Sequence, residues 1–157
     1  LIRGFEVELK SNPNHTLEVF INWSYQDNKE QHKGFDSTNL PLEFTYAPRH
    51  KINAGLSYRP TALFSAMLDV SWHDKYKAPS YWYQIREEAI RPLDDYTYIN
   101  LSLRYRLPYT VSGERPLTVF LDARNLGNET PFETLTGFGG QVVGREFFIG
   151  MKYDWTQ

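Results

Sequence analysis

Large apolar residues alternate with small or charged residues along the last part of this chain. The apolar positions are Val143, Phe147, Ile149, Met151, Tyr153 and Trp155. The positions between them carry Gly144, Glu146, Gly150, Lys152 and Asp154. A period of two indicates a β-strand with one apolar face and one polar face. The segment is therefore predicted to lie in a sheet whose two sides have different surroundings.

The same alternation recurs about seven times. It predicts strands near residues 2–10, 15–26, 49–59, 62–73, 97–106, 117–124 and 143–155. Most of these segments are longer than the strands of ordinary globular domains. Long strands with one apolar and one polar side are typical of a wall between lipid and a polar lumen. We therefore expect an all-β fold, an antiparallel transmembrane β-barrel segment of about seven long strands.

The predicted connections alternate in length along the chain. Short connectors lie near Pro13, Pro60 and Pro108. Long polar segments lie near residues 27–47, 74–92 and 125–141. Outer-membrane barrels have short periplasmic turns and long extracellular loops, so this order agrees with their architecture.

This orientation also sorts the aromatic residues of the apolar face into two belts, as expected at membrane interfaces. The periplasmic belt consists of Tyr58, Phe64, Tyr105, Tyr153 and Trp155. The extracellular belt consists of Trp23, Tyr25, Trp72 and Phe147. The faces and the orientation are assigned from the alternation and the connector lengths alone. That the aromatic residues then fall into two belts supports the barrel interpretation.

Composition excludes several other classes of protein. The formal net charge of −2 provides no basic field for nucleic acid. Mean hydropathy is −0.55. No apolar run approaches the roughly 18 residues of a membrane-spanning helix, which excludes an α-helical membrane protein. The chain has no cysteine, which excludes disulfide frameworks, thiolate zinc sites and cysteine nucleophiles.

The residues show no catalytic or metal-binding pattern. His15, His32, His50 and His73 lack the spacing of metal ligands. No serine occupies a Gly-x-Ser-x-Gly turn. We therefore expect no enzymatic activity, no cofactor and no metal site.

Three stretches resemble a known family. They read YAPRHKINAGLSY over residues 46–58, VFLDARNL over 119–126 and GREFFIGMKY over 144–153. In this order, they make the chain resemble the C-terminal part of the TonB-dependent outer-membrane receptors over essentially its whole length. The family commonly ends on an aromatic residue, whereas Thr156 and Gln157 follow Trp155 here.

The resemblance implies TonB-energised import of a scarce ligand, such as a ferric siderophore, haem or cobalamin, through a barrel plugged from within. The implied partners are outer-membrane lipid, an N-terminal plug domain, TonB and a small-molecule metal chelate. The chain begins at Leu1 without a signal-peptide pattern. We therefore expect residues 1–157 to be the C-terminal part of such a barrel in the bacterial outer membrane, with the plug and the earlier strands outside this chain.

One predicted loop carries aromatic residues beside a cation. Tyr81, Trp82 and Tyr83 precede Arg86, and a later loop contains Phe132 and Phe138. Stacked rings beside a cation could hold an aromatic, anionic ligand such as an iron chelate. The alternative is that the loop packs its rings against itself or against neighbouring loops.

Charged residues also occupy the predicted lumen face. They are Arg104, Arg106, Asp122, Arg124, Glu146 and Lys152. These residues could contact the plug or form an ionic pathway. They could equally form a hydrated wall, because polar lumens are general among barrels.

Two other functions remain open from the sequence. A passive porin-like channel would have the same wall but no plug. A soluble β-barrel that binds a ligand would turn the same apolar face into its core. The aromatic belts at both ends of the strands argue against the soluble module.

Overall fold

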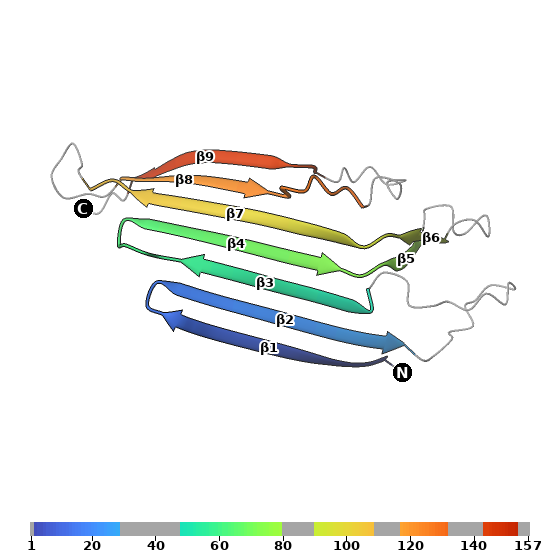
Figure 1. Cartoon of the computed structure of the whole chain (residues 1–157). Helices are drawn as coiled ribbons and strands as arrows, with labels where there is room; N and C mark the ends of the chain where they lie inside the picture. Colours follow the sequence, from blue (N-terminus) through green and yellow to red (C-terminus); the bar gives the residue numbers. More distant parts are fainter. Residues whose placement is uncertain (1, 29–47, 80–89, 109–116, 132–142, 154–157) are drawn as a thin grey trace, which may run out of the picture.

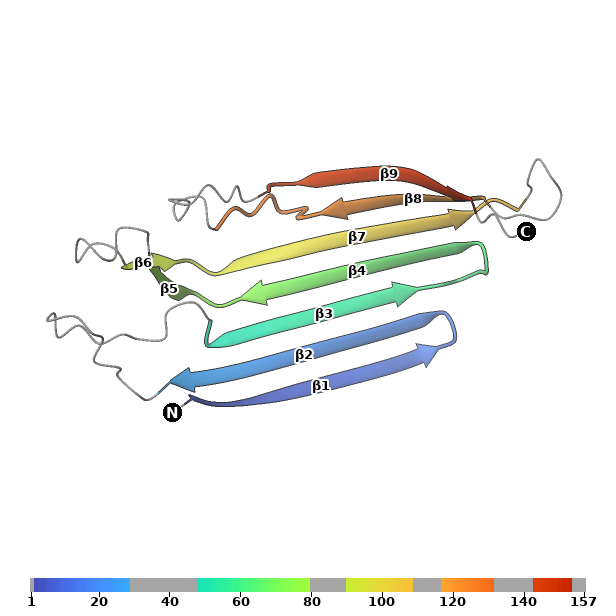
Figure 2. The same ribbon diagram turned by 180° about the vertical axis from the view of Figure 1, so that it is seen from behind.

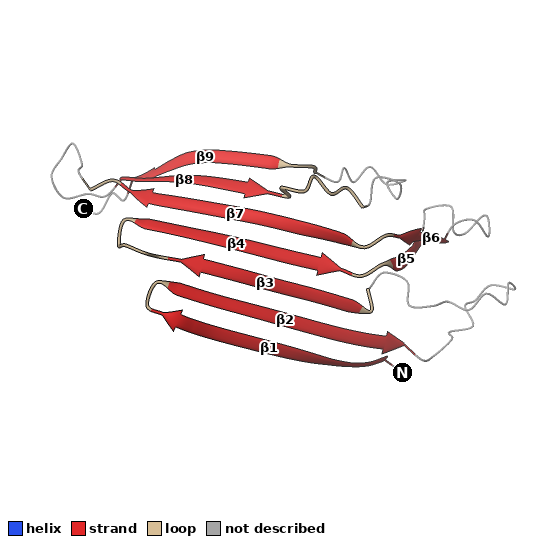
Figure 3. Cartoon of the chain, viewed as in Figure 1, coloured by secondary structure: helices blue, strands red, loops and turns tan. Residues whose placement is uncertain are grey.

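The computed structural model describes residues 2–28, 48–79, 90–108, 117–131 and 143–153. These residues form strands and connections (Figure 3). No helix in this part of the chain is long and apolar enough to cross a membrane. The predicted all-β class is therefore confirmed.

Seven strands form one sheet in the order β1-β2-β3-β4-β7-β8-β9, and all neighbours are antiparallel (Figure 1). Their bounds are Ile2–Asn14, Leu17–Asn28, His50–Tyr58, Phe64–His73, Tyr96–Arg106, Leu117–Arg124 and Glu146–Tyr153, in the same order. The short strands β5 (Tyr76–Pro79) and β6 (Ile90–Leu93) pair separately. Figures 1 and 2 show the seven strands in a single layer, with the β5–β6 hairpin beyond one end.

The register divides the sheet into two faces. The apolar face carries Phe5, Val7 and Leu9 of β1 and the residues in register with them. The polar face carries Glu6 and Glu8 and their partners across the sheet. One apolar row runs Leu56, Leu68, Leu101, Ala123, Phe147. Because side chains alternate with a period of two, a slip of one residue would exchange the faces.

The apolar face is uncovered within the described chain. Ile149 is 85% exposed, Met151 72% and Phe147 60%. Tyr96 and Ala123 are the buried hydrophobic residues of the described ranges. So much exposed apolar surface is rare on a soluble monomer and marks a face that meets lipid or another protein.

The first connection differs from the predicted one. We expected a turn at residues 11–14, but β1 continues to Asn14 and the turn is His15–Thr16. Asn14 Oδ1 accepts hydrogen bonds from Thr16 N at 2.9 Å and from Thr16 Oγ1 at 2.7 Å. The register shifts between Ser11 and Asn14. This irregularity accommodates Pro13, which has no N–H to donate to a ladder.

The predicted loop at residues 74–92 contains the β5–β6 hairpin. Its strands have 4 residues each, so they are too short to show a clear period of two. We call the end where β1 joins β2 and β3 joins β4 the turn end, and the opposite end, which bears the hairpin, the loop end.

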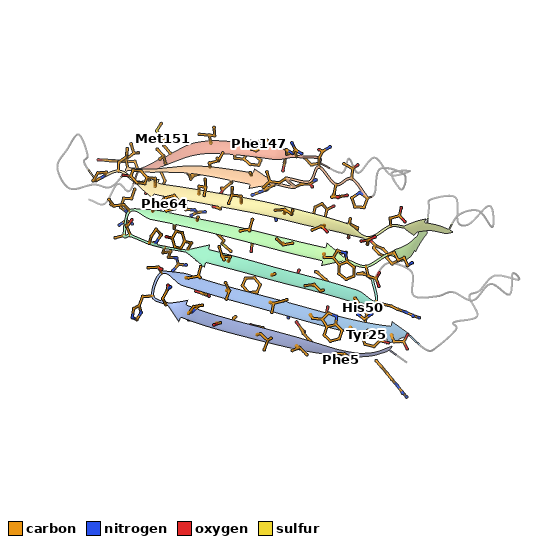
Figure 4. All side chains as sticks on the ribbon, in the orientation of Figure 1. Phe5, Tyr25, His50, Phe64, Phe147 and Met151 are labelled. Carbon is orange, nitrogen blue, oxygen red and sulfur yellow. The ribbon has the colours of Figure 1, made fainter. Side chains whose placement is uncertain are left out.

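Aromatic residues lie at both ends of the apolar face, as predicted. At the loop end, the Phe5 and Trp23 ring centroids are 5.0 Å apart, and Trp23 Nε1 donates to His50 Nδ1 at 3.3 Å. At the turn end, Phe64 is in register with Tyr105. Figure 4 shows Phe5 and His50 at one end of the sheet and Phe64 at the other. Trp155 of the predicted belt lies outside the described residues.

Two phenylalanines on the polar face lie over glycines of the next strand. Phe20 is in register with Gly55, and Phe120 with Gly150. A Cβ atom at either glycine would clash with the ring opposite it. The missing side chain therefore lets each ring lie across the sheet, which explains why Phe20 breaks the polar alternation of β2.

Leu121→Arg tests which face meets lipid. Leu121 lies on the apolar face in register with Leu103 and Ile149. We expect the free energy of unfolding, measured by urea titration in lipid vesicles, to fall by about 2–4 kcal/mol, because the guanidinium enters hydrocarbon. Ser102→Arg places the same charge beside Asp122 on the polar face, where it loses the Ser102–Asp122 hydrogen bond but stays in water, so it should cost about 1 kcal/mol or less. Equal losses would contradict the orientation of the faces.

Gly150→Ala tests the packing of Phe120. The new methyl group must displace the ring, so we expect a loss of about 1–3 kcal/mol in the same titration. Gly127→Ala is the matched control, because a Cβ there meets Glu129 Cγ at an ordinary 3.5 Å. Adding Phe120→Ser should remove most of the cost of Gly150→Ala. A cost that persists without the ring would show that the ring is not its cause.

Candidate functional site

All six charged residues predicted for the lumen lie on the polar face. Arg104 and Arg106 come from β7, Asp122 and Arg124 from β8, and Glu146 and Lys152 from β9. Asp122 Oδ1 accepts a 2.6 Å hydrogen bond from Ser102 Oγ. The Arg124 guanidinium carbon lies 5.1 Å from the centroid of the Phe148 ring.

A group that the sequence analysis did not assemble lies on the polar face at the loop end. We call it the Tyr–His cluster: His73, Tyr76, Tyr96 and Tyr98. The His73 and Tyr96 rings stack with centroids 4.7 Å apart and an interplanar angle of 10°. Tyr98 packs its edge against Tyr96 at 5.2 Å. β4, β5 and β7 thus bring together one imidazole and three tyrosines, with Tyr96 and Tyr98 against the imidazole and Tyr76 hydrogen-bonded to Tyr96.

Hydrogen bonds orient the imidazole of His73. Ser71 Oγ donates to Asn53 Oδ1 at 2.8 Å and lies 3.0 Å from His73 Nε2. A hydroxyl has one proton, so Ser71 Oγ must accept from His73 Nε2–H. This chain of bonds assigns the ring proton to Nε2 and holds the ring flat against Tyr96.

Tyr76 supplies a phenol from the hairpin. Burial raises the pKa of Tyr76 above its usual value, and a side-chain hydrogen bond with Tyr96 partly opposes that rise. The phenol therefore stays protonated at neutral pH and remains able to donate a hydrogen bond.

The cluster borders a groove of about 710 Å³. Side chains around it include Glu6, Gln26, Lys51, His73, Tyr76 and Tyr96. This volume is in the usual range for small-molecule sites. The lining combines aromatic faces with the Lys51 ammonium, the Glu6 carboxylate and several uncharged hydrogen-bonding groups. The groove can therefore stack against a ring and form hydrogen bonds, and Lys51 can contact an anionic group of a ligand.

The predicted ligand residues Tyr81, Trp82, Tyr83, Arg86, Phe132 and Phe138 lie outside the described residues. The Tyr–His cluster was missed because its members come from separate strands. One signal was present in the sequence, since His73 and Tyr98 both fall on the polar face of predicted strands.

A second hollow, of about 370 Å³, lies on the polar face at the turn end. Its polar lining residues are Arg59, Thr61, Ser65, Arg104, Arg106, Thr118 and Lys152. We call it the basic hollow. The polar face thus carries a largely aromatic site at one end and a cationic site at the other.

The residues that follow β8 fasten it to the start of β9. Asn125 and Asn128 have φ angles of 50° and 57°, which suit asparagine. The buried Asn125 side chain donates to Glu129 O and accepts from Glu129 N, both at 2.8 Å. Asn128 Oδ1 accepts from Arg145 N at 2.9 Å. We call these residues, Asn125, Asn128, Glu129 and Arg145, the clamp. Their hydrogen bonds hold the residues after β8 against the residues before β9.

Across the described ranges, no group of three or more His, Cys, Asp and Glu side chains is placed to hold a metal ion. The His73 ring already hydrogen-bonds with Ser71 through Nε2 and stacks on Tyr96.

The family model described as TonB dependent receptor-like, beta-barrel matches residues 1–126. No curated protein matches the chain. The matched residues include all strands from β1 to β8 and Asn125 of the clamp. A match over this share of the chain agrees with the antiparallel sheet and its two contrasting faces. The chain belongs to the TonB dependent receptor-like β-barrel family.

Proposed function

We propose that this chain is the C-terminal part of the barrel of an outer-membrane receptor that imports a scarce ligand with energy supplied through TonB. Membership in a family of receptors and transporters supports this function. The exposed apolar face suits lipid, and the polar face suits a lumen. The turn end is then periplasmic and the loop end extracellular.

The ligand class that we propose is a metal chelate such as a ferric siderophore, with haem and cobalamin as further members. The observation that carries this proposal is the Tyr–His cluster beside Lys51. Aromatic faces stack on conjugated ligands, and a nearby ammonium attracts their negative charge. Tyr81, Trp82, Tyr83 and Arg86, which follow β5 in the chain, are further proposed ligand residues.

The charged residues of the polar face have a different role in this proposal. Asp122, Arg124 and Glu146 belong to the wall that surrounds a plug domain, which lies outside this chain. Asp122 is hydrogen-bonded and Arg124 lies over an aromatic ring, so these side chains are held in place. A wall with fixed polar side chains offers hydrogen-bonding partners to the plug, and these side chains need not move into the lumen to do so.

Transport assays in the full-length receptor test the function. In cells that lack their own receptors for these ligands, we expect expression to restore uptake of one class among ferric siderophores, haem and cobalamin. We also expect uptake to stop when TonB is deleted. Uptake that is equal with and without TonB would instead indicate a passive porin-like channel.

Tyr96→Ala tests the ligand site. Loss of a stacking ring is expected to weaken binding of the imported ligand by roughly three- to tenfold, measured by titration of the purified receptor. Tyr96→Phe keeps the ring and should retain most of the affinity. Tyr105→Ala removes the same side chain from the other face at the turn end and should leave affinity unchanged. Equal losses in Tyr96→Ala and Tyr105→Ala would place the ligand elsewhere.

A further inference from the structure

The basic hollow gathers cations from three parts of the fold. Arg59 follows β3, Arg104 and Arg106 come from β7, and Lys152 comes from β9. Arg106 is in register with Thr118, which is in register with Lys152. The strands thus place these positive charges side by side on one face, near one end.

Carboxylates are absent from the lining of this hollow as the structure describes it. Two cations outside the hollow have carboxylate partners: Lys10 Nζ lies 3.0 Å from Glu8 Oε1, and Arg49 Nη2 lies 3.6 Å from Asp27 Oδ1. Arg104 and Arg106 have no carboxylate within ion-pair distance among the described residues. Like charges repel when they are close, so an arrangement of this kind is favourable when an anion lies between them.

Hydroxyl groups lie among the cations. Ser65 is in register with Arg104, and Thr118 with Arg106. A guanidinium offers a planar fork of donors that matches the oxygens of carboxylate and phosphate, and hydroxyls complete the shell around such oxygens. The volume of about 370 Å³ is enough for a small solute rather than a single ion.

We propose that the basic hollow binds a carboxylate or phosphate group of a diffusible anionic solute. This inference rests on the proposed function, which places the hollow on the lumen wall at the periplasmic end. It adds a second contact for the negatively charged ligand of that function, at the exit, where Arg59, Arg104 and Arg106 line the hollow. The Tyr–His cluster would then contact the solute at entry, and the basic hollow would contact its acidic groups before release.

Anion titration of the purified full-length receptor tests the inference. The probes are citrate and inorganic phosphate at low ionic strength, and isothermal titration calorimetry measures their binding. We expect saturable binding of at least one probe, weakened by added salt because screening reduces the attraction. Arg104→Gln and Arg106→Gln should each weaken binding by roughly tenfold, as expected when a hydrogen bond to a charged group is lost.

Lys10→Gln is the matched control, because it removes one positive charge from the same face outside the hollow. It should change affinity less than twofold. Arg104→Lys keeps the charge without the fork and should lie between wild type and Arg104→Gln. Folding of each variant is checked by the heat-dependent mobility of the receptor on gels, so a misfolded variant is not counted as a loss of binding.

The outcomes separate this inference from the proposed function. If neither probe binds to the intact receptor, the inference is overturned. This result is expected if an acidic side chain of the plug already fills the hollow. Equal weakening by Lys10→Gln and Arg104→Gln would also overturn it, because binding would then reflect net charge alone. TonB-independent uptake with normal anion binding would overturn the proposed function and leave the anion site standing.

Discussion

The backbone ladder of the seven-stranded sheet is the constraint on which the rest of this structure depends. Each strand pairs with its neighbours in an antiparallel register that shifts only at residues 11–14 of β1 among the described pairs, so the side-chain period of two is preserved across the sheet. That register keeps leucine beside leucine on one face, and serine beside aspartate on the other. Even the exceptions follow it, because Phe20 and Phe120 each meet a glycine in the adjacent strand. A slip of one residue would expose charge to lipid and apolar surface to the lumen.

The same register assembles chemistry from residues that are distant in the chain. Ser71 and His73 of β4 meet Asn53 of β3 and Tyr96 of β7, which places an oriented imidazole against a phenol. At the opposite end, β7 and β9 place Arg106 and Lys152 on either side of Thr118. The two sites are held by the rigid wall and not by the long connections alone. A wall of this kind can present one chemistry at entry and another at exit.

Of the three functions that the sequence left open, the exposed apolar face argues against the soluble β-module. A soluble β-module would bury that face against a second layer, yet the described strands form one layer with Ile149 and Met151 largely exposed. Family membership agrees with the lipid-facing alternative. A receptor and a passive channel share this wall, so the choice between them depends on coupling to TonB and not on the wall.

The sequence by itself determined the strand pattern, because a period of two is a local property that each segment carries alone. The faces, the aromatic positions at both ends and the polar placement of Arg104, Asp122 and Lys152 were all predictable for that reason. The turn after β1 was predicted too early, because Pro13 reads as a turn residue unless the irregular pairing of β1 with β2 is known. The β5–β6 hairpin was missed because 4-residue strands show no clear period. Only the tertiary structure decided which residues meet across strands, since cross-strand neighbours depend on register and not on distance along the chain. The Tyr–His cluster and the basic hollow are both products of that pairing.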